Sequence, residues 1–122
     1  MKPPLDPPIT FDELLARCMG DLEFSHNILH GFVVSSREQL DEITNDIAAG
    51  VDRLSTAKKV HRLKGTAATV AARPLRATLE ELETLLREAQ CDSPGPTQID
   101  ELTERAQVQF RQVAEFASTC LQ

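Results

Sequence analysis

The chain has 122 residues, of which 41% are hydrophobic and 26% are charged, as is typical of one globular domain. Its 13 basic and 19 acidic residues give a formal net charge of −6, which argues against a protein that coats nucleic acid. With five Phe and neither Trp nor Tyr, an aromatic base-stacking platform is excluded, and packed helices are favoured over an all-β core.

The cysteines and the N-terminal segment indicate a reducing, cytoplasmic setting. Cys18, Cys91 and Cys120 form no Cys-x-x-Cys pair, so neither a disulfide framework nor a cysteine-based zinc site is expected. Residues 1–9 contain four prolines and predict an extended tail or linker, without the apolar stretch of a signal peptide. Because no apolar run is long enough to span a membrane, we expect a cytoplasmic protein or a cytoplasmic module of a membrane sensor kinase.

Two helices are expected after this tail. Thr10 and Glu13 form a capping-box pattern that starts a short helix over about 11–19. A long helix should follow over 21–48, because apolar residues recur mostly at steps of three and four. Its predicted inward stripe consists of Leu22, Leu29, Phe32, Val33, Ser36, Leu40, Ile43 and Ile47.

Two more helices are expected on either side of Pro74. The first covers 51–72, and its inward residues are Leu54, Ala57, Val60, Leu63, Ala67 and Val70. The residue before a proline avoids helical geometry, so this helix should break at Arg73, and Pro74 can start a helix over 74–90. The inward residues of this next helix are Leu75, Leu79, Leu82, Leu85, Leu86 and Ala89.

A loop with two prolines and a glycine, 91–97, separates these helices from a last one over about 98–120. Its inward residues are Ile99, Leu102, Ala106, Phe110, Val113, Ala117 and Leu121. Four long amphipathic helices with short connections predict an all-α domain over 10–122. We expect an antiparallel up-down four-helix bundle, with the short N-terminal helix covering one end.

The segment 58–64 is a local positive patch, with four of the 13 basic residues and no acidic one. Its two apolar residues should face the core, so His61 should project from the helix surface beside Lys64. A glycine inside a helix costs about 1 kcal/mol relative to alanine, so Gly65 needs a reason. It could leave room for a partner beside the imidazole, or it could permit close helix packing.

Residues 61–67, His-Arg-Leu-Lys-Gly-Thr-Ala, resemble the His-x-Leu-Lys-Gly-Ser/Thr-Ala signature of histidine phosphotransfer (HPt) domains of bacterial and fungal phosphorelays. The resemblance extends over about 11–90. The flanking residues that fit are Gly20, Asp21, Ala49, Gly50, Asp52, Val70, Ala72, Leu75, Leu79, Leu82 and Glu83. The family usually has glycine where Ala71 stands, so Pro74 is expected to end the histidine helix instead.

The resemblance implies a phosphorelay intermediate, a phosphocarrier and not an enzyme with its own ATP site. His61 would accept a phosphoryl group from the receiver aspartate of a response regulator and pass it to another receiver. A hybrid sensor histidine kinase is a further possible partner. The receiver would supply Mg²⁺, and this chain would need no cofactor of its own. An exposed histidine is substantially deprotonated near neutral pH, as nucleophilic attack requires.

Basic and small residues near His61 have candidate roles. Lys64 is expected to offset the charge of the arriving phosphoryl group, although it could be only a solvated lysine. Lys58 and Arg62 could steer the acidic pocket of a receiver or simply face water. Ala68, two turns along the helix, would keep the surface beside the histidine small.

Residues on other helices have two interpretations each. Glu83 and Arg87 could hold the second imidazole nitrogen or belong to the docking face, but an i, i+4 ion pair explains them equally well. The acidic run of Glu80, Glu81 and Glu83 fits a solvated helix face more simply than a carboxylate site. The apolar residues of the short first helix could dock a receiver or cover the bundle end; they are Phe11, Leu14 and Leu15.

Other functions are less well supported. A non-phosphorylated adaptor that binds a receiver or kinase would need none of His61, Lys64 and Gly65. A nucleic-acid binder is disfavoured by the acidic charge and few aromatics, and no direct membrane contact is expected. His26 and His30 have the spacing of two zinc ligands, but no third ligand is evident, so we expect a surface pair.

Overall fold

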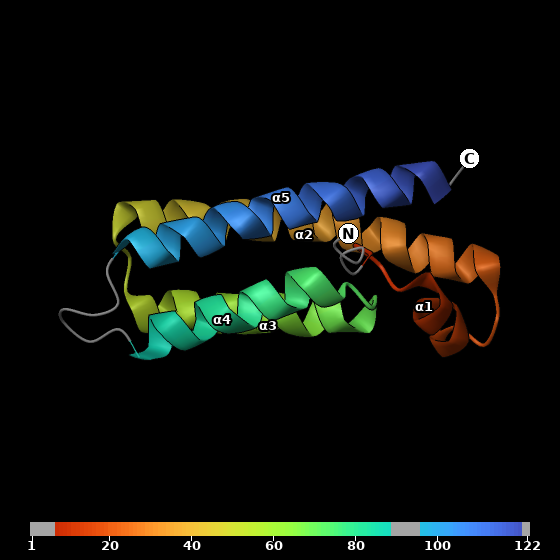
Figure 1. Ribbon diagram of the computed structural model, residues 1–122, viewed down its shortest axis with the longest axis horizontal. Coiled ribbons are helices and arrows are strands. Elements are labelled where there is room, and N and C mark those ends of the chain that lie inside the picture. The colour runs from red at the N-terminus through yellow and green to blue at the C-terminus, as the bar shows by residue number, and fades with distance from the viewer. Residues whose placement is uncertain (1–6, 89–95, 121–122) are drawn as a thin grey trace, which may run out of the picture.

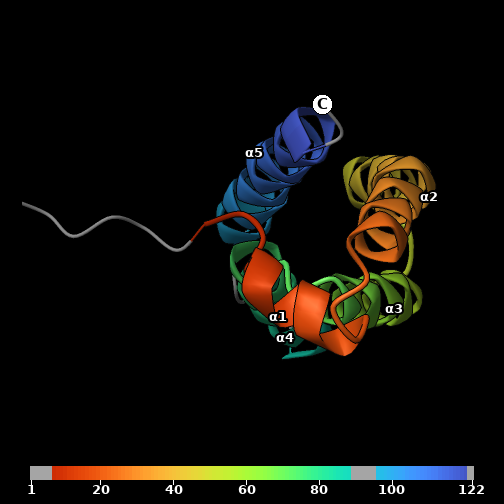
Figure 2. The same ribbon diagram turned by 90° about the vertical axis from the view of Figure 1, so that its right-hand side faces the viewer.

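Five helices, and no strand, make up the part of the chain that this computed structural model describes, residues 7–88 and 96–120. They are α1 (Phe11–Arg17), α2 (Leu22–Ala49), α3 (Arg53–Thr69), α4 (Arg73–Glu88) and α5 (Pro96–Cys120). The four long helices form an antiparallel bundle in which α3 and α4 lie beside each other, opposite α2 and α5 (Figure 1). Figure 2 shows α1 lying across one end of this bundle. The predicted fold class is therefore confirmed.

Polar caps begin α2 and α3, and a left-handed glycine lies in the turn between them. The side chain of Asp21 accepts a hydrogen bond of 2.9 Å from a backbone N–H in the first turn of α2. Gly50 ends α2 with a φ of 73°, a backbone conformation that glycine adopts without strain. Asp52 then caps α3 by accepting from the N–H of Ser55 at 3.0 Å. The short connection makes the two helices antiparallel.

Most of the predicted inward residues lie in one core, but two do not. Leu22 is 53% exposed and Leu54 is 50% exposed, so both predictions were wrong. Leu22 lies in the first turn of α2, which extends beyond the ends of α3 and α4 (Figure 1). Leu54 lies about 120° around α3 from the buried Val60, because successive three-residue steps drift off the buried face. Ser25 and Ala57 are the buried residues one turn later. Ala89 and Leu121 lie outside the described residues.

The capping-box prediction for α1 was also wrong. Within the described chain, the Thr10 side chain makes no cap hydrogen bond, and Glu13 forms ion pairs with Arg17 and Arg73. Two guanidinium groups compete successfully for the carboxylate that a capping box would need. Hydrogen bonds from Arg73 lower the pKa of Glu13, despite an opposing effect of burial.

The residues of α1 mainly cover the bundle end. Leu14 is buried, Leu15 is partly buried, and the ring of Phe11 lies 6.1 Å from that of Phe116 between centroids. Ile9, at the end of the expected tail, is also buried. Burial removes Leu14 from the candidates for a docking surface. None of the described helices is long and apolar enough to cross a membrane.

The end of α3 differs from the prediction. The helix ends at Thr69, and Ala71 adopts a φ of 60° in the left-handed region. Pro74 lies in the first turn of α4, which begins at Arg73. The proline therefore does not end the histidine helix; an alanine does so in the conformation that favours glycine.

Met19 and Ala71 are the two non-glycine residues with positive φ among the described residues. Replacing Met19 with glycine should raise the free energy of unfolding by about 0.5–1 kcal/mol, because it removes the strain of a Cβ in the left-handed region. The Met19 side chain is 94% exposed, so no packing is lost.

Ala71→Gly is the matched control, to be measured beside Met19→Gly by urea unfolding. Ala71 is buried, so its replacement also loses a buried methyl group worth about 0.8 kcal/mol. We therefore expect a smaller increase in the free energy of unfolding than for Met19→Gly. A larger increase for Ala71→Gly than for Met19→Gly would contradict this prediction.

Candidate functional site

His61 stands on the outer surface of α3, near the middle of the helix. Val60 and Leu63 on either side of it are fully buried, and they orient α3 against the core. The imidazole side chain is 61% exposed. The helix therefore holds the ring outside the core on a rigid support, where another protein can reach it.

The carboxylate of Glu83 on α4 holds the inner nitrogen of this ring. His61 Nδ1 lies 3.0 Å from Oε2 and 3.2 Å from Oε1 of Glu83. An ionised carboxylate can only accept hydrogen bonds, so Nδ1 carries the hydrogen and donates it. In that tautomer Nε2 carries the lone pair, and Nε2 is the nitrogen available for attack on an electrophile.

Glu83 is ionised although it is only 8% exposed. Burial raises its pKa, but hydrogen bonds from Lys64, Arg87 and His61 outweigh that effect and lower the pKa to about 2. The Nζ atom of Lys64 lies 2.9 Å from Oε1, and Nε of Arg87 lies 2.9 Å from Oε2. The buried charge is thus fully paired, as a buried carboxylate requires.

These contacts correct the prediction of a solvated acidic run, and they decide between the alternatives for Arg87 and Lys64. Glu80 and Glu81 are exposed, but Glu83 is not part of a solvated face. Glu83 and Arg87 do form the i, i+4 ion pair, and Glu83 also contacts the imidazole, so the two interpretations hold together. Lys64 is partly buried between two carboxylates, Glu83 and Glu80, the latter at 4.0 Å. It is therefore not a solvated lysine.

Open space adjoins the imidazole along α3. A Cβ atom added to Gly65 would meet nothing within 4 Å in the described structure, so Gly65 does not serve close helix packing. Ala68, a further turn along, is partly exposed. His61, Gly65 and Ala68 follow one face of the helix, and small residues leave this face accessible beyond the ring.

The other basic residues of α3 differ in their surroundings. Lys58 and Arg62 are exposed. Lys59 lies 2.6 Å from Asp46 and 2.5 Å from Glu42, and hydrogen bonds to these carboxylates raise the pKa of Lys59. The positive patch predicted for residues 58–64 is therefore partly neutralised by α2, which further disfavours phosphate-backbone binding.

The histidine pair on α2 has no third metal ligand nearby in the part of the chain that the structure describes. The ring of His26 packs against that of Phe11 in a tilted arrangement, with the centroids 5.7 Å apart, and His30 is exposed. No group of three or more His, Cys, Asp or Glu that could hold a metal ion occurs among the described residues. Cys18 is a buried free thiol. Cys91 and the side chain of Cys120 lie outside the described part of the chain.

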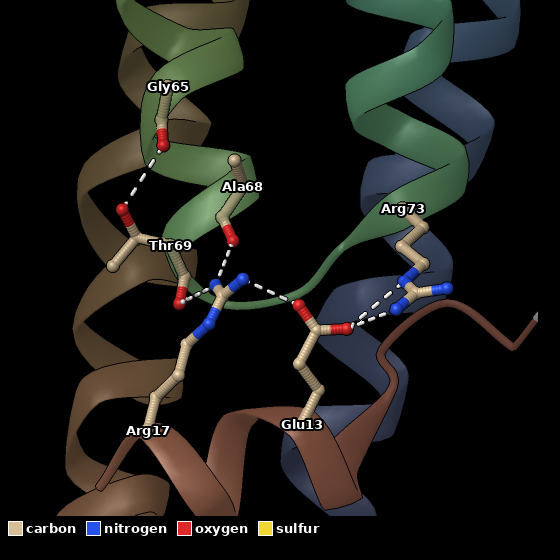
Figure 3. A network of polar contacts seen from close by, with 6 residues as sticks. All are labelled: Glu13, Arg17, Gly65, Ala68, Thr69 and Arg73. Atoms are coloured by element: carbon tan, nitrogen blue, oxygen red, sulfur yellow. Dashed lines mark hydrogen bonds and ion pairs between the residues drawn. The ribbon is translucent and has the colours of Figure 1, made fainter.

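Arg17 of α1 has a role that the sequence did not reveal. Its Nη1 donates to the carbonyl oxygens of Ala68 and, at 3.1 Å, Thr69, while Glu13 joins it to Arg73 of α4 (Figure 3). A cation at these last carbonyls satisfies acceptors that a helix end leaves unpaired. Arg17 lies 51 positions before Ala68 and 52 before Thr69 in the chain, so no local pattern could have predicted the contact.

A bundle that presents a histidine between a buried carboxylate and an open helix face is suited to group transfer by the imidazole. A family model described as "Hpt domain" matches residues 27–118. The chain therefore belongs to the Hpt domain family, and it has a phosphotransfer role in two-component systems, with response-regulator or kinase components as partners. Comparisons with curated proteins and with solved structures found no match.

Proposed function

We propose that the chain is a phosphorelay intermediate whose reactive atom is Nε2 of His61. Nε2 attacks the phosphorus of a receiver's aspartyl phosphate, an N–P bond forms, and the P–O bond to the aspartate breaks and frees its carboxylate. Transfer to a second receiver reverses these steps. The observation that carries the proposal is the exposed ring anchored through Nδ1 on Glu83, which leaves Nε2 as the free nucleophile.

The surrounding charges support this chemistry. Attack by Nε2 leaves a positive charge on the ring, and the carboxylate at Nδ1 stabilises it electrostatically. Lys64 lies beside the same carboxylate, and we assign to it the neutralisation of the phosphoryl oxygens. We place the Mg²⁺ in the receiver domain. The buried free thiol of Cys18 supports a reducing, cytoplasmic location.

The test is incubation of the protein with a receiver domain that carries labelled phosphate. We expect label on this chain, as a phosphoramidate that is stable to alkali and labile to acid, mapped to His61 by mass spectrometry. Label that stays on the receiver, or that maps to another residue, would overturn the proposal. Stable binding of the phosphorylated receiver without transfer would favour the adaptor function.

Gly65→Gln should slow transfer from the receiver while making the protein more stable. A residue with side chain in mid-helix should add up to about 1 kcal/mol to the free energy of unfolding, since glycine is a poor helix former and its Cβ meets no neighbour. The longer side chain would occupy the open face beside His61, and displacing the phosphoryl donor by about 1 Å can cost about a hundredfold in rate.

Gly65→Ala is the control for this variant. It should also raise the temperature of thermal unfolding, but it should lower the rate of phosphotransfer much less than Gly65→Gln does. Unchanged transfer by Gly65→Gln would show that the space beside the ring is not used by a partner.

A further inference from the structure

A groove with an arginine rim lies where α1 meets the α3–α4 turn. It has a volume of about 580 Å³, and we call it the arginine groove. Its lining includes Glu13, Arg17, Ala68, Arg73, Arg76 and Ala77. Figure 3 shows α1 closing its lower end, with Ala68 on one side and Arg73 on the other. Short alanine side chains leave the space, and the longer charged side chains border it.

This groove is continuous with the face that carries His61. Ala68 belongs both to its lining and to the helix face on which His61 and Gly65 lie. Ala68 lies seven positions after His61 on α3, which is about 10 Å at about 1.5 Å per residue. A protein partner covers about 800 Å² of surface on each side of a standard interface. One partner placed over His61 can therefore also fill the groove.

The charge of the groove is positive. Three guanidinium groups, of Arg17, Arg73 and Arg76, line it together with one carboxylate, that of Glu13. Glu13 is shared by Arg17 and Arg73, and Arg76 lies 3.9 Å from Glu80, so the lining keeps more cations than carboxylates. All three arginine side chains keep more than two fifths of their surface exposed. This concentration of positive charge stands on a chain of net charge −6, so it is a local feature that attracts an acidic surface.

The groove on the other side of His61 carries a smaller excess of positive charge. It lies between α2 and α3, has a volume of about 380 Å³, and is lined by residues that include Glu42, Lys59 and Arg62. There Lys59 is already paired with Glu42 at 2.5 Å. The lining on that side has one cation more than it has carboxylates, whereas the lining of the arginine groove has two more. The arginine groove is therefore the more favourable of the two for an acidic surface.

We infer that the arginine groove is the docking site for an acidic surface of the phosphorylated receiver domain, which it orients with the aspartyl phosphate over His61. The inference rests on the proposed function and adds the side from which the partner approaches. It also gives α1 a part in recognition.

Filling the groove tests the inference. Ala77 is exposed on α4, lines the groove and carries no charge, so Ala77→Trp fills it without breaking an ion pair. The matched control is Ala48→Trp, exposed near the opposite end of α2. We expect Ala77→Trp to raise the receiver concentration for half-maximal transfer by about tenfold with a nearly unchanged maximal rate. Ala48→Trp should match the wild type.

Charge reversal gives an independent measurement. Arg76→Glu and Arg111→Glu change the net charge equally, but Arg111 is an exposed residue of α5, far along the chain from the groove. We expect Arg76→Glu to raise the half-saturating receiver concentration about tenfold and to flatten its dependence on salt, since fewer attractive charges remain. Arg111→Glu should have little effect. Circular dichroism spectra and melting curves verify that each variant is folded.

The outcomes separate this inference from the proposed function. Wild-type protein that acquires no label on His61 refutes both. Normal labelling of His61 with wild-type half-saturation in Ala77→Trp and Arg76→Glu refutes the docking site alone. Impairment by Thr66→Trp, which fills the groove between α2 and α3, without impairment by Ala77→Trp would place the receiver on that other side and also overturn the inference.

Discussion

Replacing His61 with glutamine should abolish labelling by a phosphorylated receiver, a loss of at least about a thousandfold, because a carboxamide cannot form the phosphoramidate. The glutamine amide can still donate to Glu83, and the position is exposed. The free energy of unfolding should therefore change by no more than about 0.5 kcal/mol.

His30→Gln is the matched control, because His30 is also exposed on a long helix. It should be labelled at the wild-type rate. The assay is quantitation of label on the chain against time, with thermal unfolding of each variant. If His61→Gln acquires label, or if His30→Gln loses as much labelling as His61→Gln, the assignment of the reactive residue is contradicted.

Replacing Glu83 should change both the stability of the bundle in acid and the rate of phosphotransfer. The pKa of Glu83 is about 2, against an ordinary value of 4.5. Since the folded-state pKa is the lower one, ionised Glu83 stabilises the fold above about pH 4.5. This contribution is lost as the pH falls toward 2, and the shift corresponds to about 3 kcal/mol.

The measurement is urea unfolding of the wild type and of Glu83→Gln at pH 7 and near pH 2. We expect a gap in the free energy of unfolding of about 3 kcal/mol at pH 7 that narrows toward zero in acid. Glu80→Gln, at an exposed position of the same helix, should show little gap at either pH. A gap for Glu83→Gln that stays constant would show that its carboxylate is not held by Lys64 and Arg87.

The effect on phosphotransfer distinguishes a positioning role from a structural one. Glutamine can still accept from Nδ1 of His61 but cannot stabilise the positive ring, whereas Glu83→Leu can do neither. We expect the maximal transfer rate to fall in the order wild type, Gln, Leu, with about 10–100-fold lost in Leu. The half-saturating receiver concentration should change little. Arg87→Gln leaves the carboxylate in place and should be much closer to the wild type.

Local patterns were sufficient for the helices and for the exposed position of His61 on its helix. The periodicity of apolar residues placed the long helices because the interior of a bundle selects one face of each helix. Errors occurred at Leu54, where repeated three-residue steps drift off the buried face of α3, and at Leu22, in the first turn of α2. A helix's first turn can extend past its neighbours, and periodicity contains no information about that.

The motif around His61 was visible in the linear sequence because residues three and four apart share a helix face. What the linear sequence left open was the partner of the ring, since Glu83 had two equally good interpretations. The contact depends on how α4 packs against α3, and packing across helices joins residues distant in the chain. In the folded bundle Glu83 is buried, and its carboxylate is paired with Lys64, Arg87 and His61.

The contact of α1 with the end of the histidine helix also separates what the local sequence determines from what tertiary packing determines. Length, charge, helix periodicity and the exposed histidine follow from residues close together in the chain. The ion pairs of Glu13 with Arg17 and Arg73, and the groove that they border, arise from helices brought together by burial of their apolar faces. Side-chain charges can pair only after that packing has placed them within a few ångströms, so local sequence could not indicate them.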